Sequence, residues 1–320
     1  MHRAGWPAPP CLPARARKSH MASTTDWKRA DDRIGILFIV PFALAALVFM
    51  VYPVAEAVRL SFFEHNPLRP DASHFVGLAN FRTINDDPLF WHSFRQGAVW
   101  TAWSILLQTV IGVALALLLH LPLRGISVFR GLLLFPYIVP TVVIALVLQW
   151  MLNGEIGVVN WSLKGAGLID EDIYWLATPS MAMASTIALN VWKYTPFVTI
   201  CVLARLQSIP LELYDAARVD GAGVLRRFFD ITLPQLAEVL TVVVIFRTIW
   251  TFNKFEEIYL LTKGGPGTST FNLAIYSFEQ SVANLKMGVG AATGVVMMFL
   301  LFAGSLVYMR VFKFADEETS

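Results

Sequence analysis

Two otherwise apolar segments of the chain, 181–203 and 236–261, carry polar side chains at helical spacing. The substrate-site candidates are Asn190, Lys193 and Tyr194 in the first segment and Arg247, Trp250, Thr251 and Lys254 in the second. Residues three, four and seven positions apart lie on one side of a helix, so each set forms one polar face. Amide, hydroxyl and cationic groups beside aromatic rings suit a polyol, which offers hydroxyls for hydrogen bonds and C–H faces for stacking. We predict that both faces line a sheltered, wet cavity.

The cationic members of this set are costly inside a membrane. Arg247 and Lys254 together cost about 5 to 7 kcal/mol at the centre of a bilayer, and roughly ten apolar neighbours at about 0.5 kcal/mol each barely offset that cost. The second segment therefore cannot simply face lipid. Two other interpretations stay open: Arg247 or Lys193 pairs with a carboxylate of a partner subunit, or Lys254 extends with Glu256 and Glu257 to the outer interface of the membrane.

The composition indicates that the surroundings of these segments are lipid. Hydrophobic residues make up 56% of the chain, charged residues only 15%, and the mean hydropathy is +0.58. These values are typical of an integral membrane protein. Each of four charge-free runs, 34–55, 96–123, 131–154 and 287–309, is long enough to cross about 30 Å of hydrocarbon. With the two polar segments, we predict an all-α polytopic membrane protein with helices at about 34–58, 97–121, 129–152, 180–205, 235–262 and 287–311.

The basic residues indicate the orientation of these helices. With a cytoplasmic N-terminus, the inner regions hold fifteen Lys and Arg residues and the outer regions seven, which obeys the positive-inside rule. Both termini and the loop 206–234 are then cytoplasmic. We expect a disordered N-terminal segment, 1–33, a transmembrane domain, 34–313, and a short cytoplasmic tail, 314–320. The first twenty residues have no apolar core and are not a signal peptide, so we expect Met21 to be the natural initiator.

The loop between the fourth and fifth helices reads LELYDAARVDGAGVLRRFFDITLP from Leu211 to Pro234. Pro210 and Glu212 favour a helix start, because a missing N–H and an anion are both accommodated in a first turn. Gly221 permits a bend or a close backbone approach. The loop therefore has the features of a docking element, although an ordinary amphipathic linker lying on the membrane is the alternative.

The same loop resembles the cytoplasmic coupling loop in the membrane subunits of bacterial ABC importers. The family pattern is Glu-Ala-Ala, a short spacer, Asp-Gly-Ala, and then Ile-x-Leu-Pro. The matching positions, which the resemblance implies contact the ATPase, are Asp215, Ala216, Ala217, Asp220, Gly221, Ala222, Leu233 and Pro234. Asp215 departs from the pattern, since the family more often has Glu there. Flanking elements such as Val76-Gly77-Leu78-Ala79-Asn80-Phe81 resemble the carbohydrate importers of the maltose and glycerol-3-phosphate type.

This resemblance implies a complete transport machine. The fold would be the type-I ABC importer permease fold in a bacterial plasma (inner) membrane, and the chain would form half of a heterodimeric pore with a second homologous permease. Two copies of a cytosolic ABC ATPase would bind ATP and Mg, and an extracytoplasmic solute-binding protein would deliver a sugar or related polyol. The chain itself would hold no cofactor, and its remaining partner would be membrane lipid rather than nucleic acid.

The motifs expected of an enzyme are missing from the sequence. The run Gly264-Gly265-Pro266-Gly267 lacks the Gly-Lys-Ser/Thr ending of a phosphate-binding loop, so this chain is not expected to hydrolyse ATP. The only cysteines, Cys11 and Cys201, lack metal-ligand spacing, and we expect neither catalytic nor metal-ligating residues. The alternatives to an importer subunit are an ion-coupled secondary carrier and a membrane-embedded enzyme or scaffold. A carrier would use intramembrane carboxylates, which the charge-free helices lack.

Overall fold

A computed structural model of the chain describes residues 39–122 and 124–317. The expectations for the N-terminal segment 1–33 and for Met21 lie outside these residues. The chain divides into two compact units, 1–55 and 56–320, and each is described by itself. In the first unit the described backbone is helical and runs through a π-helical turn, η1 (Leu47–Val51), into α2 (Tyr52–Ser61), whose last residues belong to the second unit.

Five helices among the described residues are long and apolar enough to cross a membrane. They are Ile39–Ser61, Pro88–His120, Pro179–Ser208, Val224–Phe252 and Met287–Arg310. Two further helices, Ile126–Ile138 and Thr141–Met151, bring the number to six when they are counted as one bent span. The architecture is therefore all-α and polytopic, as the sequence predicts.

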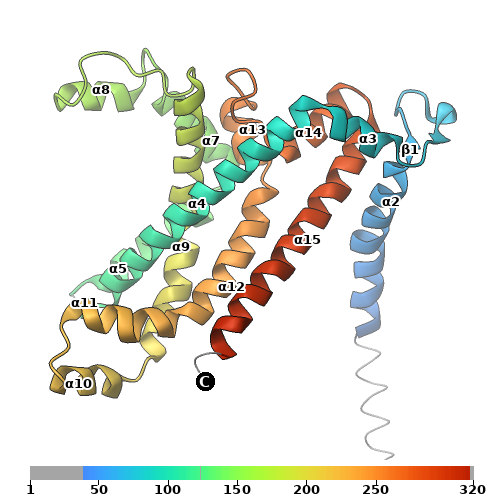
Figure 1. The fold of residues 1–320 in the computed structure, drawn as a ribbon. Helices are drawn as coiled ribbons and strands as arrows, with labels where there is room; N and C mark the ends of the chain where they lie inside the picture. The colour runs from blue at the N-terminus through green and yellow to red at the C-terminus, as the bar shows by residue number, and fades with distance from the viewer. Residues whose placement is uncertain (1–38, 123, 318–320) are drawn as a thin grey trace, which may run out of the picture. The chain divides into compact units, whose positions relative to one another are not determined.

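The second unit is built on four long helices joined by short ones (Figure 1). The long helices are α4 (Pro88–His120), α9 (Pro179–Ser208), α12 (Leu233–Phe252) and α15 (Met287–Glu317). The short helices are α3 (Ala79–Asp86), α5 (Ile126–Leu133), α6 (Phe135–Ile138), α7 (Thr141–Met151), α8 (Val158–Gly165), α10 (Leu211–Val219), α11 (Val224–Arg227), α13 (Glu256–Thr262) and α14 (Leu273–Phe278), with single turns η2 (Pro70–Ala72), η3 (Phe228–Thr232) and η4 (Glu279–Ala283). The strands β1 (Phe63–Glu64) and β2 (His74–Phe75) form one antiparallel pair.

The prediction of a continuous third helix over 129–152 is wrong. The chain turns by 91° between α6 and α7, at Val139 and Pro140. Proline lacks the N–H that would continue the helix, and its ring pushes the preceding residue into extended backbone. Val139 accordingly has a ψ of 133°. The bend leaves the carbonyl of Val139 free to bond elsewhere.

Three other predicted helices also differ from the structure. The fifth helix, predicted over 235–262, is split into α12 and α13, because the Asn272 side chain donates to the carbonyl of Lys254 at 2.6 Å and holds the break. The second helix begins at Pro88 rather than 97, with Asp87 capping it through a 2.8 Å bond from the N–H of Leu89. The first turns of this helix contain Arg95, so they lie outside the charge-free run that predicts the span. The last helix continues to Glu317, beyond the predicted end at 311.

Helix α9 is the centre of the second unit. It packs against α4, α12, α13 and α6, and most of its membrane-spanning part is buried. The contact with α4 is close at Gly112, where an added Cβ would lie 2.8 Å from Cβ of Val198. The apolar core around this contact includes Ala116, Val202 and Leu236, all fully buried. This packing fixes the spacing of the helices that carry the polar candidates.

Asp87 joins the start of α4 to α14. Besides capping α4, its carboxylate accepts a 2.7 Å bond from the hydroxyl of Tyr276. Burial raises the pKa of Tyr276, and the hydrogen bond to the carboxylate raises it further, so the phenol stays neutral and remains a donor.

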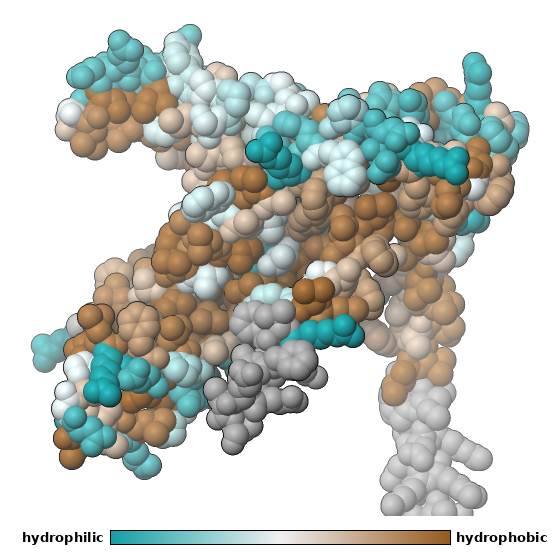
Figure 2. All heavy atoms as spheres, viewed as in Figure 1, coloured by the Kyte–Doolittle hydropathy of each residue, from teal (hydrophilic) through white to brown (hydrophobic). Residues whose placement is uncertain are grey.

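The surface of the second unit is apolar between two polar ends. Figure 2 shows hydrophobic side chains along the long helices and hydrophilic ones gathered near α8 and α3 at one end and near α10 at the other. Large exposed side chains in the apolar region include Trp103, Leu106, Phe246 and Phe299. A surface of this kind fits a lipid environment.

Candidate functional site

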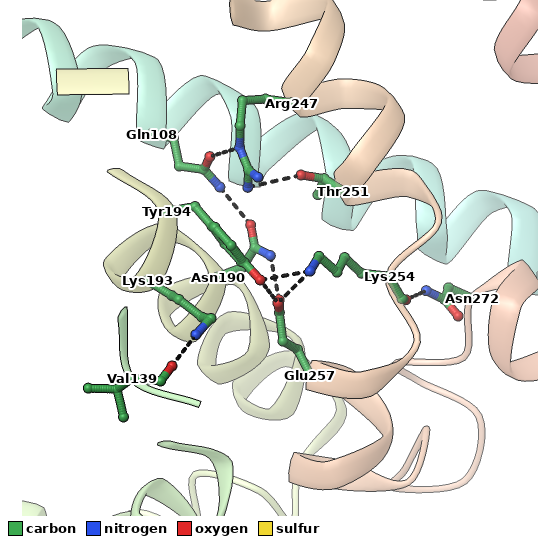
Figure 3. A network of polar contacts seen from close by, with 10 residues as sticks. All are labelled: Gln108, Val139, Asn190, Lys193, Tyr194, Arg247, Thr251, Lys254, Glu257 and Asn272. Carbon is green, nitrogen blue, oxygen red and sulfur yellow. Dashed lines mark hydrogen bonds and ion pairs between the residues drawn. The ribbon is translucent and has the colours of Figure 1, made fainter. Parts of the chain in front are cut away.

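Seven polar side chains from α4, α9, α12, α13 and the break between the last two form one connected set, called here the polar network (Figure 3). Its members are Gln108, Asn190, Tyr194, Arg247, Thr251, Lys254 and Glu257. Five of them are among the sequence-predicted candidates, and they come from segments far apart in the chain. Glu257 and Gln108 were not predicted.

Glu257 is the centre of the polar network. Its carboxylate is fully buried and accepts hydrogen bonds from the amide of Asn190 at 2.5 Å and the hydroxyl of Tyr194 at 2.6 Å. The ammonium of Lys254 lies 3.5 Å from the same carboxylate and donates to the Tyr194 hydroxyl at 2.7 Å. A buried carboxylate is tolerated only when it is paired and hydrogen-bonded, and this one is both.

Arg247 extends the polar network from α12 to α4. Its Nε donates to Oε1 of Gln108 at 3.0 Å, and its Nη2 donates to the hydroxyl of Thr251 at 3.3 Å. Gln108 in turn donates to the amide oxygen of Asn190 at 2.6 Å. The guanidinium lies 4.2 Å from the ring centroid of Tyr194, within the range of a cation–π contact. Three helices are thus bridged by polar groups at mid-helix.

The structure separates two candidates from this set. Lys193 is buried but points toward the bend of the third span, where its ammonium donates to the free carbonyl of Val139 at 2.6 Å. Trp250 is 46% exposed and packs against aromatic rings, 5.8 Å from Phe197 and 5.9 Å from Phe246. Trp250 therefore lies beside the polar network rather than in it.

The sequence predicts that both polar faces line a cavity. In the described part of this chain, the polar side chains instead face one another. Asn190 and Thr251 are fully buried, and Arg247 is only 2% exposed, because these side chains turn toward one another. The physical reason is Glu257, which supplies an internal partner that the predicted site lacked. Its burial also excludes the interpretation in which Lys254 and Glu257 extend together to the membrane surface.

The second group of candidates forms a helical hairpin of α10 and α11. Helix α10 begins directly after Pro210 and ends at Val219, and Gly221, two residues further on, has a φ of +75°. Ala222 donates its N–H to the carbonyl of Ala217 at 2.8 Å, and Gly221 donates to that of Arg218 at 3.1 Å. These two bonds define a Schellman cap with glycine in its left-handed position. The Asp-Gly-Ala run is therefore the sequence of a helix end.

Most of the hairpin is turned to solvent. Asp215 and Arg218 form an exposed ion pair at 2.8 Å. Apolar side chains are exposed with them, including Leu211 at 72%, Val219 at 88% and Leu225 at 75%. Ala216 and Asp220 are also exposed, while Leu233 and Pro234 open α12 behind the hairpin. This end of the chain presents a mixed polar and apolar surface without an apolar cover among the described residues.

The hairpin is anchored to the long helices by hydrogen bonds. The hydroxyls of Tyr214 and Thr232 lie 3.0 Å apart and join α10 to η3. Arg205, near the end of α9, donates to the carbonyl and side-chain oxygens of Gln235 in α12, each at 2.9 Å. The first contact links the two sides of the hairpin loop, and the second joins α9 to α12 where the loop leaves and rejoins the long helices.

Comparison with known proteins identifies the family. The family model described as binding-protein-dependent transport system inner membrane component matches residues 108–317. The chain belongs to this family of ABC importer permeases. It is 37% identical over 311 residues to the sulfoquinovosyl glycerol transport system permease protein SmoG of Agrobacterium fabrum, covering 94% of this chain and 98% of the relative. It is 36% identical to the trehalose/maltose transport system permease protein MalF of Thermococcus litoralis, covering 91% and 97%.

Solved structures show the same fold. A chain of a bacterial alginate ABC transporter, crystallised with an alginate pentasaccharide-bound periplasmic protein, superposes with a TM-score of 0.77 at 23% identity, covering 89% of this chain and 94% of that one. A second alginate transporter structure gives 0.74. The fold is therefore the type-I ABC importer permease fold, in a multi-pass protein of the plasma membrane. As a permease, the chain is the membrane-spanning subunit of an ATP-driven importer rather than an ion-coupled carrier.

The permease also contains site residues that sequence reasoning missed. Gln108 lies in a run that was interpreted only as a membrane span, and Glu257 lies beyond a helix break that the sequence does not announce. Tyr137, at 40% exposure, packs edge-on against Tyr194 with ring centroids 6.1 Å apart. The available sequence signal was Pro140, which ends the helix that carries Tyr137. Among the described residues no group of three His, Cys, Asp or Glu is placed to hold a metal ion.

Proposed function

We propose that this permease forms half of the translocation pathway for a sugar or related polyol, with a second homologous permease as the other half. The observation that carries this proposal is the aromatic set beside the polar network. Tyr137 and Phe197 stack at 6.4 Å, and Phe197 leads to the half-exposed Trp250. Flat rings next to hydrogen-bonding groups complement the two chemical faces of a sugar. The names of both relatives given above contain a sugar, which supports the same substrate class.

The proposed site combines the predicted residues with those found in the structure. Asn190, Tyr194 and Thr251 would offer amide and hydroxyl groups, and Arg247, Lys193 and Lys254 would offer cationic donors. Trp250 would supply an exposed ring. Because most of these groups are buried in this structure, substrate would reach them only when the helices move apart, which is the expected behaviour of a site with alternating access.

The α10–α11 hairpin is proposed to couple the permease to ATP hydrolysis. Two copies of a cytosolic ABC ATPase would dock, one on each permease, and would bind ATP and Mg themselves. Leu211, Val219 and Leu225 would enter an apolar groove of the ATPase, while Asp215 and Asp220 would meet its basic side chains or cap its N–H groups. Burial of exposed apolar side chains of this size is sufficient to drive docking.

The proposed orientation places both termini and the hairpin in the cytoplasm. It rests on the excess of basic residues on that side. The opposite end, with α3 and α8, would then receive an extracytoplasmic solute-binding protein. A reporter fused after Phe229 is expected to read cytoplasmic, and reporters inserted near Asp71 or Gly267 are expected to read external. The reverse pattern would contradict the orientation and the coupling assignment together.

Transport by the reconstituted complex tests the substrate pathway. Replacement of Asn190 by Leu, or of Arg247 by Met, is expected to weaken sugar uptake while the ATPase still assembles with the permease. Replacement of the exposed Lys286 by Met is the control, since Lys286 lies outside the polar network and the aromatic set. Unchanged uptake kinetics in both site variants would remove these residues from the pathway.

A further inference from the structure

Three cations converge on one aromatic ring in the centre of the permease. The charged groups of Arg247, Lys254 and Lys193 lie 4.2, 4.8 and 5.7 Å from the ring centroid of Tyr194. Figure 3 shows that these side chains come from different elements, α12, the break after it, and α9 itself, and that Lys193 is directed toward the carbonyl of Val139. Arg247 and Lys193 are 2% and 5% exposed. Positive charge is therefore concentrated in a small volume that is shielded from water.

Negative charge does not match this concentration. Glu257 is the buried carboxylate of the cluster, and it pairs with Lys254. Within residues 39–310, neither Arg247 nor Lys193 has a carboxylate oxygen within the 4.0 Å of an ion pair; their bonds go to uncharged oxygens of Gln108, Thr251 and Val139. Glu256 is adjacent in sequence but exposed. The cluster thus has an excess of buried positive charge.

Such an excess is unfavourable unless an anion completes it. Buried charges are retained when they are paired or when they serve a ligand, and cations inside a membrane protein mark substrate pathways. Two ammonium groups and a guanidinium around one ring can donate to several oxygens of a carboxylate, sulfonate or phosphate group. The aromatic set beside them would hold the rest of a sugar.

We propose that the substrate of this permease is a carbohydrate that carries an anionic group, and that this group binds between Arg247, Lys254 and Lys193 around Tyr194. This inference rests on the proposed function, because it assigns the charge of the sugar that the same site would take. Glu257 acts as the resident anion that holds Lys254 while the site is empty. The competing explanation is a carboxylate of the partner permease that neutralises the same cations.

Thermal unfolding of the substrate-free complex separates these explanations without knowledge of the sugar. The variants Arg247→Gln and Lys193→Gln keep a donor and remove one charge each, with Lys286→Gln as the matched control outside the cluster; Lys254 is left unchanged because its replacement would leave Glu257 without its ion-pair partner. If the positive charge is unpaired, its removal relieves repulsion, and the melting temperature of the substrate-free complex rises relative to the control. If a partner carboxylate pairs with these cations, both variants melt lower, and the inference is overturned.

Binding to matched sugars tests the charge preference directly. The probes are sulfoquinovose against glucose and galacturonate against galactose, with inorganic sulfate as a third arm, measured on the intact complex in nanodiscs by tryptophan fluorescence. The charged member of at least one pair is expected to bind about tenfold or more tightly than its neutral counterpart, and Arg247→Gln is expected to abolish the difference. Sulfate that binds as tightly as the charged sugar would mark a site for free anions and overturn the inference.

Uptake by cells distinguishes failure of this inference from failure of the proposed function. A competition panel containing neutral sugars, anionic sugars, amino acids and peptides identifies the transported class. Selective competition by anionic sugars is the expected result. Competition by neutral sugars alone overturns the anionic substrate and leaves the proposed function intact, whereas competition by amino acids or peptides overturns both.

Discussion

The α10–α11 hairpin and the polar network are built in opposite ways. The hairpin is held by contacts between near neighbours, such as the Asp215–Arg218 pair three residues apart. In the polar network, hydrogen bonds that cross between helices join residues 60 to 139 positions apart. The hairpin is exposed to solvent, and the network is closed on itself. One region is free to meet a partner, and the other holds the chain together.

This difference separates function from stability. A substitution in the hairpin is expected to change what the permease does without changing whether it folds, because few of its side chains support the core. A substitution in the polar network that leaves a buried group without its partner is expected to do both, because such a group bears the full cost of desolvation. Substitutions in the two regions, measured for both transport and stability, test this distinction.

The largest effect is expected at the hairpin itself. Gly221→Trp and, separately, Asp215→Lys should leave the permease folded and inserted but abolish transport. A side chain at position 221 is strained by the positive φ, but an added Cβ meets no described atom of this chain within 4 Å, so we expect obstruction beyond that strain to come from the docked ATPase. Uptake and ATP hydrolysis stimulated by the loaded binding protein are the measurements. Gly167→Trp is the control for backbone strain in the measurement of folding, because Gly167 also has positive φ and open space around it.

Retention of full stimulated ATP hydrolysis in both hairpin variants would show that this hairpin is not the coupling element. Loss of the folded permease, detected by size-exclusion chromatography, would instead show that the hairpin supports the core, and the distinction drawn above would fail.

The buried carboxylate is expected to dominate stability. Glu257→Leu removes the acceptor of Asn190 and Tyr194 and leaves the Lys254 charge without its partner, so the free energy of unfolding should fall by about 3 to 5 kcal/mol. The control is Glu256→Leu, its exposed neighbour, which should change stability by less than about 0.5 kcal/mol. Thermal or denaturant unfolding in detergent gives the comparison. Equal losses in the two variants would contradict the central role of Glu257.

The spacing of α4 and α9 is expected to have an intermediate effect. Gly112→Ala places a methyl group against Val198 at 2.8 Å, one turn away from Gln108, and should destabilise the permease by about 1 to 3 kcal/mol through overpacking. It should also weaken the bond between Gln108 and Asn190. Gly294→Ala in α15 is the matched control, because its Cβ meets nothing within 4 Å, and it should be neutral or stabilising. A neutral result at Gly112 would show that the helices separate easily.

The smallest effect is expected from the link between α10 and η3. Tyr214→Phe removes the hydrogen bond to Thr232 and should cost about 1 kcal/mol, while the ring keeps its packing. The hairpin would then be held less firmly, and stimulated ATP hydrolysis should fall severalfold rather than vanish. Tyr52→Phe, at a residue 67% exposed, serves as the control. Complete loss of coupling would mean that this one bond carries the transmission.

The same contrast explains what the sequence could predict. The Asp220-Gly221-Ala222 cap is local, so its shape follows from three consecutive residues. The i, i+4 contact of Arg247 with Thr251 is also local and lies on the predicted polar face. Glu257 could not be placed, because a bond from the distant Asn272 sets the helix break that turns it inward. The sequence places Lys193 on the same helix face as Tyr194. The bend at Pro140 exposes the carbonyl of Val139, and Lys193 donates to that carbonyl instead of joining the polar network.

Helix α9 gives these two regions a mechanical relation. It carries Tyr194 near its middle, and only Ile209 and Pro210 connect it to α10. Tyr194 and the end of α9 next to the hairpin are therefore about 21 Å apart along the helix axis. Pro196, two residues from Tyr194, lacks an N–H and so removes one backbone hydrogen bond from α9. If docking of the ATPase bends α9, we expect the bend to occur at Pro196, and the positions of the charged groups around Tyr194 would change with it.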